Sequence, residues 1–130
     1  MRFVVGITGA SGAIYAQRLL DCLNPQEHEI HVVMSRYAHQ VVTEEIGELR
    51  VQEGTHLHRD ATMNVPFVSG SSRFDAMVIV PCSMGTIGRI VYGVSDTTLL
   101  RAADVFLKEK RKLLLVPRET PFNLIHAKNL

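Results

Sequence analysis

The sequence has no tryptophan and only two cysteines among its 130 residues. Cys22 and Cys82 lie far apart and form no CxxC pair. This pattern argues against a disulfide framework and against a thiolate metal site, so no metal ligands are assigned. We therefore expect a protein of a reducing compartment, the cytoplasm.

Charge of one sign and long apolar runs are also missing. The 14 basic residues nearly balance the 13 acidic ones, which leaves no basic surface for a general nucleic-acid binder. Gly6, Gly9 and Gly12 interrupt the apolar start too early for a signal peptide, and no other window is long enough to span a membrane. We expect neither nucleic acid nor membrane as a partner.

The residues that are present predict one domain, 1–130, with a packed core, because 46% are hydrophobic and 21% are charged. Short β-branched runs predict strands at 2–7, 29–35, 75–81 and 112–118. Helical spacing predicts helices at 11–24, 36–47, 83–93 and 97–111, with Ser11 and Asp96 as N-caps, and another helix from Thr120-Pro121. Residues 48–73 have no steady period and are expected to be mostly loop.

Alternating strands and helices predict an α/β fold, a Rossmann-like (flavodoxin-like) doubly wound parallel sheet with helices on both faces. The last helix reaches Leu130 without a capping glycine. We therefore expect the domain to be C-terminally incomplete, with its last strand and helix missing.

The first strand-to-helix turn, "TGASG" at 8–12, is typical of a phosphate site. Gly9 and Gly12 permit close approach of a ligand, and Thr8, Ser11 and the free amides at the helix start provide donors. The dinucleotide fingerprint is absent, and the second strand ends at Ser35 rather than at an acid. NADP is therefore disfavoured but not excluded, because Arg36 is suited to binding its 2′-phosphate.

Two further strand ends have matching chemistry. "PCSMGT" at 81–86 supplies the hydroxyls of Ser83 and Thr86, and Ser83 also suits a helix cap. "PRETP" at 117–121 places the fork-shaped cation of Arg118 beside the carboxylate of Glu119. Because these ends meet at one edge of a parallel sheet, they predict a site for a mononucleotide with one phosphate, such as FMN.

Three motifs, "GITGASGAIYAQRLL", "PCSMGT" and "RAADVFLKEKRKLLLVPRETPF", closely resemble the flavin prenyltransferase family of UbiX-like proteins. The resemblance covers residues 2–130 except 48–66, where we find no family pattern. It implies transfer of the dimethylallyl group of dimethylallyl phosphate to reduced FMN, which yields prenylated FMN for UbiD-type decarboxylases. It also implies a homo-oligomer based on trimers, up to a dodecamer.

The resemblance also assigns site residues. It implies that FMN is held by Gly9, Ala10, Ser11, Ser35, Ser83, Met84, Gly85, Thr86, Arg101 and Arg118. The implied catalytic residues are Ser11, Glu45, Lys108 and Glu119, with Glu45 near the reacting flavin edge and Arg101 nearby. Breaking a C–O bond to phosphate forms an allylic cation and an anion, so cations and a proton donor are suitable there. Without the resemblance, Lys108 and Arg101 would be interpreted as solvated helix charges.

Family members continue past the last predicted helix and use a later Tyr and a basic residue for the substrate phosphate. If the chain ends at Leu130, we expect FMN binding with weak or absent prenyl transfer.

Three alternatives stay open. "HLHRD" at 56–60 resembles the H-x-H-x-D run of metallo-β-lactamase-like hydrolases, but Ala61 follows where that motif has His, and solvated loop histidines explain the run better. An FMN-dependent cysteine-type decarboxylase typically has an Asn-containing "PASAN" turn where this chain has "PCSMG". A non-catalytic flavin-binding module is the third alternative.

Overall fold

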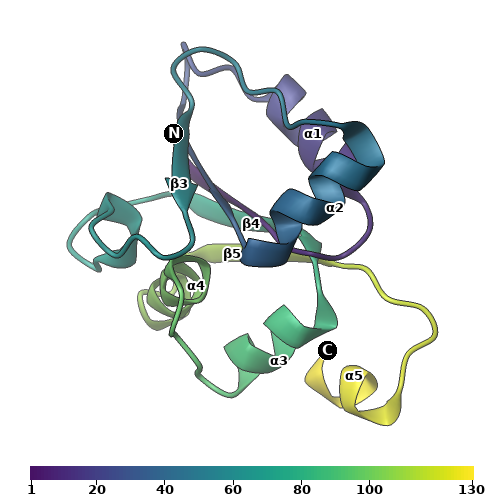
Figure 1. Ribbon diagram of the computed structural model, residues 1–130. Helices are drawn as coiled ribbons and strands as arrows, with labels where there is room; N and C mark the ends of the chain where they lie inside the picture. The colour runs from purple at the N-terminus through teal and green to yellow at the C-terminus, as the bar shows by residue number, and fades with distance from the viewer.

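The computed structural model describes residues 1–130 as one sheet flanked by helices (Figure 1). The elements in chain order are β1 (Arg2–Ile7), α1 (Ala13–Cys22), β2 (Glu29–Met34), α2 (Arg36–Ile46), β3 (His56–Arg59), the 3-10 helix η1 (Pro66–Val68), β4 (Ala76–Cys82), α3 (Met84–Val91), α4 (Thr98–Lys108), β5 (Lys112–Pro117) and α5 (Leu124–Asn129). All strands are parallel, in the order β3-β2-β1-β4-β5. The predicted doubly wound parallel sheet is confirmed, and its strand order reverses between β1 and β4.

The two faces of the sheet carry separate cores, since alternate side chains of a strand point to opposite faces. Val5 and Ile7 of β1 pack with α1 and α2, whereas Val4 packs with α4 and with Phe67 of η1. Figure 1 shows α1 and α2 on one side of the sheet and α3 and α4 on the other. Burial on both faces explains why the central strands are continuous apolar runs.

The segment 48–73, predicted to be mostly loop, contains β3 and η1, so that prediction is wrong in part. β3 is an edge strand that pairs with β2, and most of its side chains are exposed. An edge strand of four residues leaves no apolar period in the sequence. His56 and His58 lie on this strand rather than in a loop and stack against His31 of β2, although His56 is exposed as predicted and His58 is half-buried.

Three predicted helix starts are wrong by one to four residues. The N-cap of α1 is Gly12 and not Ser11, and the N-cap residue makes no side-chain hydrogen bond to the helix. Thr97, not Asp96, caps α4, because its extended backbone lets its side chain accept a hydrogen bond from Leu100 N. The last helix begins at Leu124, after Asn123 as N-cap.

The C-terminal part of the chain is the least covered. Leu114 and Val116 on one face of β5 are 47% and 43% exposed, and α5 has no buried residue. This face of the sheet has no helix over it at β5. None of the helices has the length and apolar character needed to cross a membrane.

Candidate functional site

A cleft of about 430 Å³ lies at the carboxyl edge of the sheet, where the strand order reverses. It is lined by Thr8, Gly9, Ser35, Arg36, Tyr37, Asp60, Ser83, Thr86, Arg89, Asp96, Thr97, Leu99 and Leu100. The lining comes from the turns that follow β1 to β4 and from the start of α4. Ligand sites of open α/β sheets occupy this position, and the cleft has the volume of a small-molecule site.

Thr8 joins the turn after β1 to the turn after β4. Its buried hydroxyl donates to the Pro81 carbonyl at 2.7 Å and accepts from the Ser83 amide at 2.8 Å. The sequence pattern predicts the Thr8 hydroxyl as a donor for a ligand. The structure instead engages this hydroxyl in fixing the distance between the β1 and β4 turns.

Gly9 and Gly12 are each required by the backbone of the first turn. A Cβ on Gly9 would lie 2.6 Å from the Cβ of Tyr37, so the turn can pack on α2 only without a side chain there. Gly12 has φ +119°, a conformation that L-residues rarely adopt. These glycines therefore have a structural role in addition to any contact with a ligand.

The start of α3 presents hydrogen-bonding groups to the cleft. The Ser83 hydroxyl accepts from the Thr86 amide at 3.1 Å and is hydrogen-bonded to the Thr86 hydroxyl at 2.9 Å, which confirms Ser83 as a helix cap. Arg89 lines the same cleft three residues after Thr86. A helix start, two hydroxyls and a guanidinium together suit a phosphate.

Met84 and Gly85 contribute differently from Ser83. The Met84 side chain is buried in the core, so only its backbone is placed to face a ligand. A Cβ on Gly85 would be in ordinary contact with Arg89, 3.4 Å from its Nη1. Ser35 and Gly9 line the cleft, whereas Ala10 stands in the turn just beyond Gly9.

Glu45 of α2 occupies the start of α1. Its Oε2 accepts hydrogen bonds from the amides of Gly12 at 3.0 Å and Ala13 at 2.9 Å. A hydrogen bond from Ser11 lowers the pKa of this carboxyl most, and the two amides and the positive charge of Arg118 lower it further. The structure thus brings Ser11, Glu45 and Arg118 together and satisfies the α1 amides, predicted to bind a ligand anion, with an internal carboxylate.

The remaining predicted residues are more dispersed. Arg118 and Glu119 follow β5, where the Arg118 amide donates to the Cys82 carbonyl at 3.2 Å. Arg101 pairs with Asp104 at 3.2 Å, and Lys108 lies 3.9 Å from Glu109. Because α4 enters the cleft with its first turn, Lys108 at its other end is about 15 Å further along the helix axis. Lys108 does not line the cleft of its own chain.

Asp60 is a cleft residue that the sequence analysis missed. Its Oδ1 accepts from the Leu99 amide at 2.7 Å and its carbonyl from the Thr98 amide at 2.8 Å, so it holds the start of α4. Burial raises the pKa of its carboxyl. The available signal was an acid directly after a strand. It could not be used because 48–73 was expected to be mostly loop, with no strand before Asp60.

Arg89 is a second missed residue. It stands three positions after Thr86, a spacing that places two residues of a helix on one face, and both line the cleft. The neighbouring glycines, Gly85 and Gly88, interrupt the helical pattern of this segment in the sequence.

Comparisons with known proteins agree with this geometry. A family model described as Flavoprotein matches residues 1–129. The flavin prenyltransferase UbiX of Methanocaldococcus jannaschii is 42% identical, over 100% of this chain and 72% of the relative. A dodecameric FMN-dependent UbiX-like decarboxylase from Escherichia coli O157:H7 matches in structure with TM-score 0.91 and 39% identity, over 99% of this chain and 72% of that chain. AnUbiX (PadA1), solved with FMN and dimethylallyl pyrophosphate, matches with TM-score 0.89 and 40% identity, over 98% and 70%.

The chain therefore belongs to the Flavoprotein family, among its UbiX flavin prenyltransferases. The family predicted from the three motifs is confirmed. The match to the Methanocaldococcus jannaschii relative covers the whole chain, so it includes 48–66, where the sequence analysis found no family pattern.

Proposed function

We propose that residues 1–130 form a single FMN-binding domain that transfers the dimethylallyl group of dimethylallyl phosphate to reduced FMN. One observation carries this proposal: the turns after β1, β2 and β4 converge on one polar cleft, in a chain that is 42% identical to a flavin prenyltransferase over its whole length. The crystal structure of AnUbiX with FMN and dimethylallyl pyrophosphate supports the same ligand class.

The phosphate of FMN is assigned to the start of α3. Ser83 and Thr86 offer hydroxyls there, and Ser35 and Arg89 line the same cleft. The start of α1 is the weaker site for a phosphate, because the carboxylate of Glu45 already accepts from its amides. The donor set therefore suits a single phosphate at α3, with the flavin ring extending toward Gly9, Ala10 and Ser11.

Bound reduced FMN supplies the electron-rich ring that accepts the prenyl group. Glu45 is held by the Gly12 and Ala13 amides, which keeps its carboxylate ionised beside Ser11 and able to stabilise the positive charge that develops on the allyl group. Arg118 and Glu119 follow β5, where they are assigned to the substrate phosphate as a cation and a proton donor.

Lys108 and Arg101 are assigned to the site through an oligomer. Lys108 is too far along α4 to reach its own cleft, and it is exposed. The dodecameric relative supports a homo-oligomer, which we take to be based on trimers, in which α4 of one subunit completes the site of a neighbour. The product is assigned to a UbiD-type decarboxylase as recipient, and the compartment to the cytoplasm.

The test is to incubate the purified chain with reduced FMN and dimethylallyl phosphate without oxygen, and to determine the mass of the flavin. Bound FMN together with a flavin heavier by one prenyl unit supports the transferase. Bound FMN that stays unmodified after long incubation contradicts transfer by residues 1–130, agrees with the weak or absent transfer expected for a chain that ends at Leu130, and favours a carrier. A chain that retains no FMN contradicts the assignment of the cleft.

A further inference from the structure

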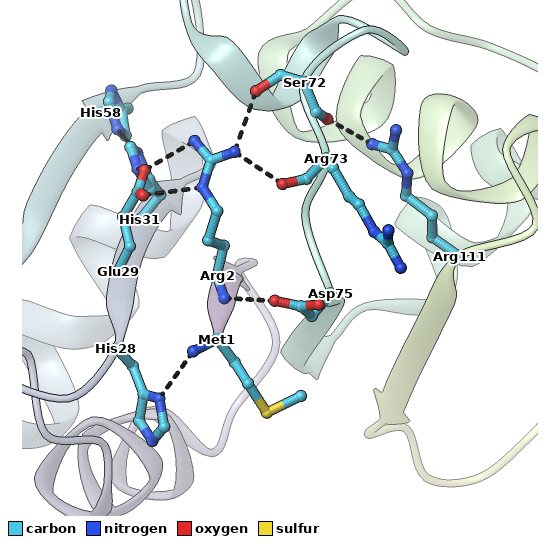
Figure 2. A network of polar contacts seen from close by, with 10 residues as sticks. All are labelled: Met1, Arg2, His28, Glu29, His31, His58, Ser72, Arg73, Asp75 and Arg111. Atoms are coloured by element: carbon cyan, nitrogen blue, oxygen red, sulfur yellow. Dashed lines mark hydrogen bonds and ion pairs between the residues drawn. The ribbon is translucent and has the colours of Figure 1, made fainter.

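Three histidines join β3 to the sheet. His31 of β2 is buried, and its ring stacks on His56 and His58 of β3 with centroid separations of 4.6 and 5.0 Å. His31 Nδ1 lies 2.7 Å from His58 Nε2, and His31 Nε2 lies 2.8 Å from Glu29 Oε1. Figure 2 shows His58, His31 and Glu29 in a row that continues to Arg2.

Arg2 closes the other end of this row. Its guanidinium binds Glu29 through Nε at 2.8 Å and Nη2 at 3.0 Å, and it lies 4.1 Å from the ring centroid of Phe74. The carboxylate of Asp75 accepts from the Arg2 amide at 2.7 Å. Phe67 and Phe74 pack edge-on against His31 and bring no charge.

Acidification therefore adds positive charge to the row without adding a negative charge to balance it. Arg2 from β1 and His56 from β3 face the pair formed by His31 and His58, while Glu29 is the one carboxylate bonded to it. No set of three or more His, Cys, Asp or Glu side chains is arranged to hold a metal ion.

The contacts define the tautomers of the two rings. The hydrogen bond from Arg2 lowers the pKa of Glu29 to about 2, so at neutral pH its carboxylate only accepts hydrogen bonds. His31 must therefore carry its proton on Nε2, and its bare Nδ1 must accept from His58. Both rings are neutral Nε2–H tautomers.

Protons added to the pair have unequal effects. One proton added on His58 Nδ1 leaves a single N–H between the rings, whether that bridging proton stays on His58 Nε2 or moves to His31 Nδ1. A second proton places an N–H of each ring against the other across 2.7 Å, which no hydrogen bond can satisfy. The contact must then open.

We propose that the contact between His31 and His58 is an acid-released latch on β3, and that its opening also frees the Asp60 cap at the start of α4. β3 runs directly into Asp60, which accepts from the amides of Thr98 and Leu99 at the wall of the cleft. Release of the edge strand therefore loosens the wall of the cleft even when no ligand is bound. The latch is independent of the proposed transferase activity.

The direction of the pH effect follows from the pKa of both rings. Burial lowers the pKa of His31 and of His58 below the ordinary value of 6.5. The unfolded chain then binds more protons than the folded one as the pH falls below that value. The latch is complete above pH 6.5 and is lost as the pH falls through the lowered values, while Glu29 stays ionised.

The experiment is amide hydrogen exchange of the full chain by NMR between about pH 7.5 and about pH 4.5, corrected for intrinsic rates. Protection of the β3 amides and of the Thr98 and Leu99 amides should fall at least about tenfold, while protection of β4 amides stays within about twofold. In His58→Gln, whose amide still donates to His31 but does not titrate, this selective fall should disappear. His39→Gln, which removes an exposed histidine of α2, should behave as the parent chain.

An equal fall in His58→Gln, or pH-independent protection of β3 in the parent chain, overturns the proposal. Imidazole ¹⁵N shifts of the parent chain supply a second readout that needs no variant. Nε2–H tautomers of both rings at neutral pH support the latch, and an Nδ1–H tautomer of His31 contradicts it.

Discussion

At the scale of single residues, the proposed site depends on polar groups that bind one another. Thr8 links two turns, Ser83 caps α3, and Glu45 caps α1 from a different helix. Side chains with such internal bonds keep their positions before a ligand arrives. This preorganisation lowers the entropy that binding must overcome.

The first prediction concerns Glu45. Glu45→Ala leaves the Gly12 and Ala13 amides without a partner and should lower the free energy of unfolding at pH 7 by about 1 kcal/mol, as the loss of a helix cap does. Because the folded pKa of Glu45 is lowered, its contribution is complete above the ordinary value of 4.5 and is lost as the pH falls through the lowered value. Urea unfolding at several pH values measures both effects. Glu44→Ala, an exposed neighbour, should change little, and an equal loss in both variants would contradict the cap.

The second prediction concerns the thiols. Cys82 is fully buried, which raises its pKa to about 12, whereas Cys22 is exposed. A shift from 9.0 to about 12 reduces the thiolate fraction at neutral pH about a thousandfold. A thiol reagent should therefore label one cysteine rapidly in the native chain and both in denaturant, and Cys22→Ser should abolish the rapid phase. Rapid labelling of two native thiols would refute the burial of Cys82.

At the scale of elements, the fully buried strands could be predicted from the sequence and the edge strand could not. β1, β2 and β4 are apolar because both of their faces are covered. β3 owes its conformation to pairing with β2, a contact that its own polar residues do not encode. Asp60 and the cap of Glu45 were missed for the same reason, since both depend on partners more than 30 residues away.

The start of α4 provides the prediction at this scale. The Thr98 hydroxyl is fully buried and donates to the Thr62 carbonyl at 2.6 Å, which ties α4 to the segment after β3. Thr98→Val keeps the shape but removes this hydrogen bond, at a cost of about 0.5 to 1.5 kcal/mol in the free energy of unfolding. Chemical denaturation measures the loss. Thr43→Val removes an exposed hydroxyl bonded to the His39 carbonyl and should cost clearly less; equal costs would argue against the tie.

At the scale of the whole molecule, the carboxyl edge of the sheet holds the cleft and the C-terminal part leaves apolar surface uncovered. The sequence motifs located that edge correctly, because they follow strands that the fold brings together. The predicted helix at 97–111 already placed Lys108 near its end, but the sequence did not show that the opposite end of α4 meets the cleft, because that depends on how α4 lies against the sheet.

The uncovered face of β5 predicts association of the chain. Leu114 and Val116 are exposed on the face of β5 that no helix covers, and exposed apolar side chains in a group favour contact with another protein surface. The chain should sediment as more than a monomer at micromolar concentration, and Val116→Lys should lower its apparent mass. Val91→Lys, at a valine of α3 that is 53% exposed, is the matched control. Equal effects of the two variants would show that β5 is not the contact surface.

The central claim is that the start of α3 holds the phosphate of FMN, and comparison of FMN with riboflavin tests it directly. These flavins differ only in the phosphate, so fluorescence titration of the chain should give at least about tenfold tighter binding of FMN. In Ser83→Ala, which removes the hydroxyl at the helix start, most of that difference should vanish while riboflavin binding stays the same. Equal affinity of the parent chain for both flavins would contradict the account.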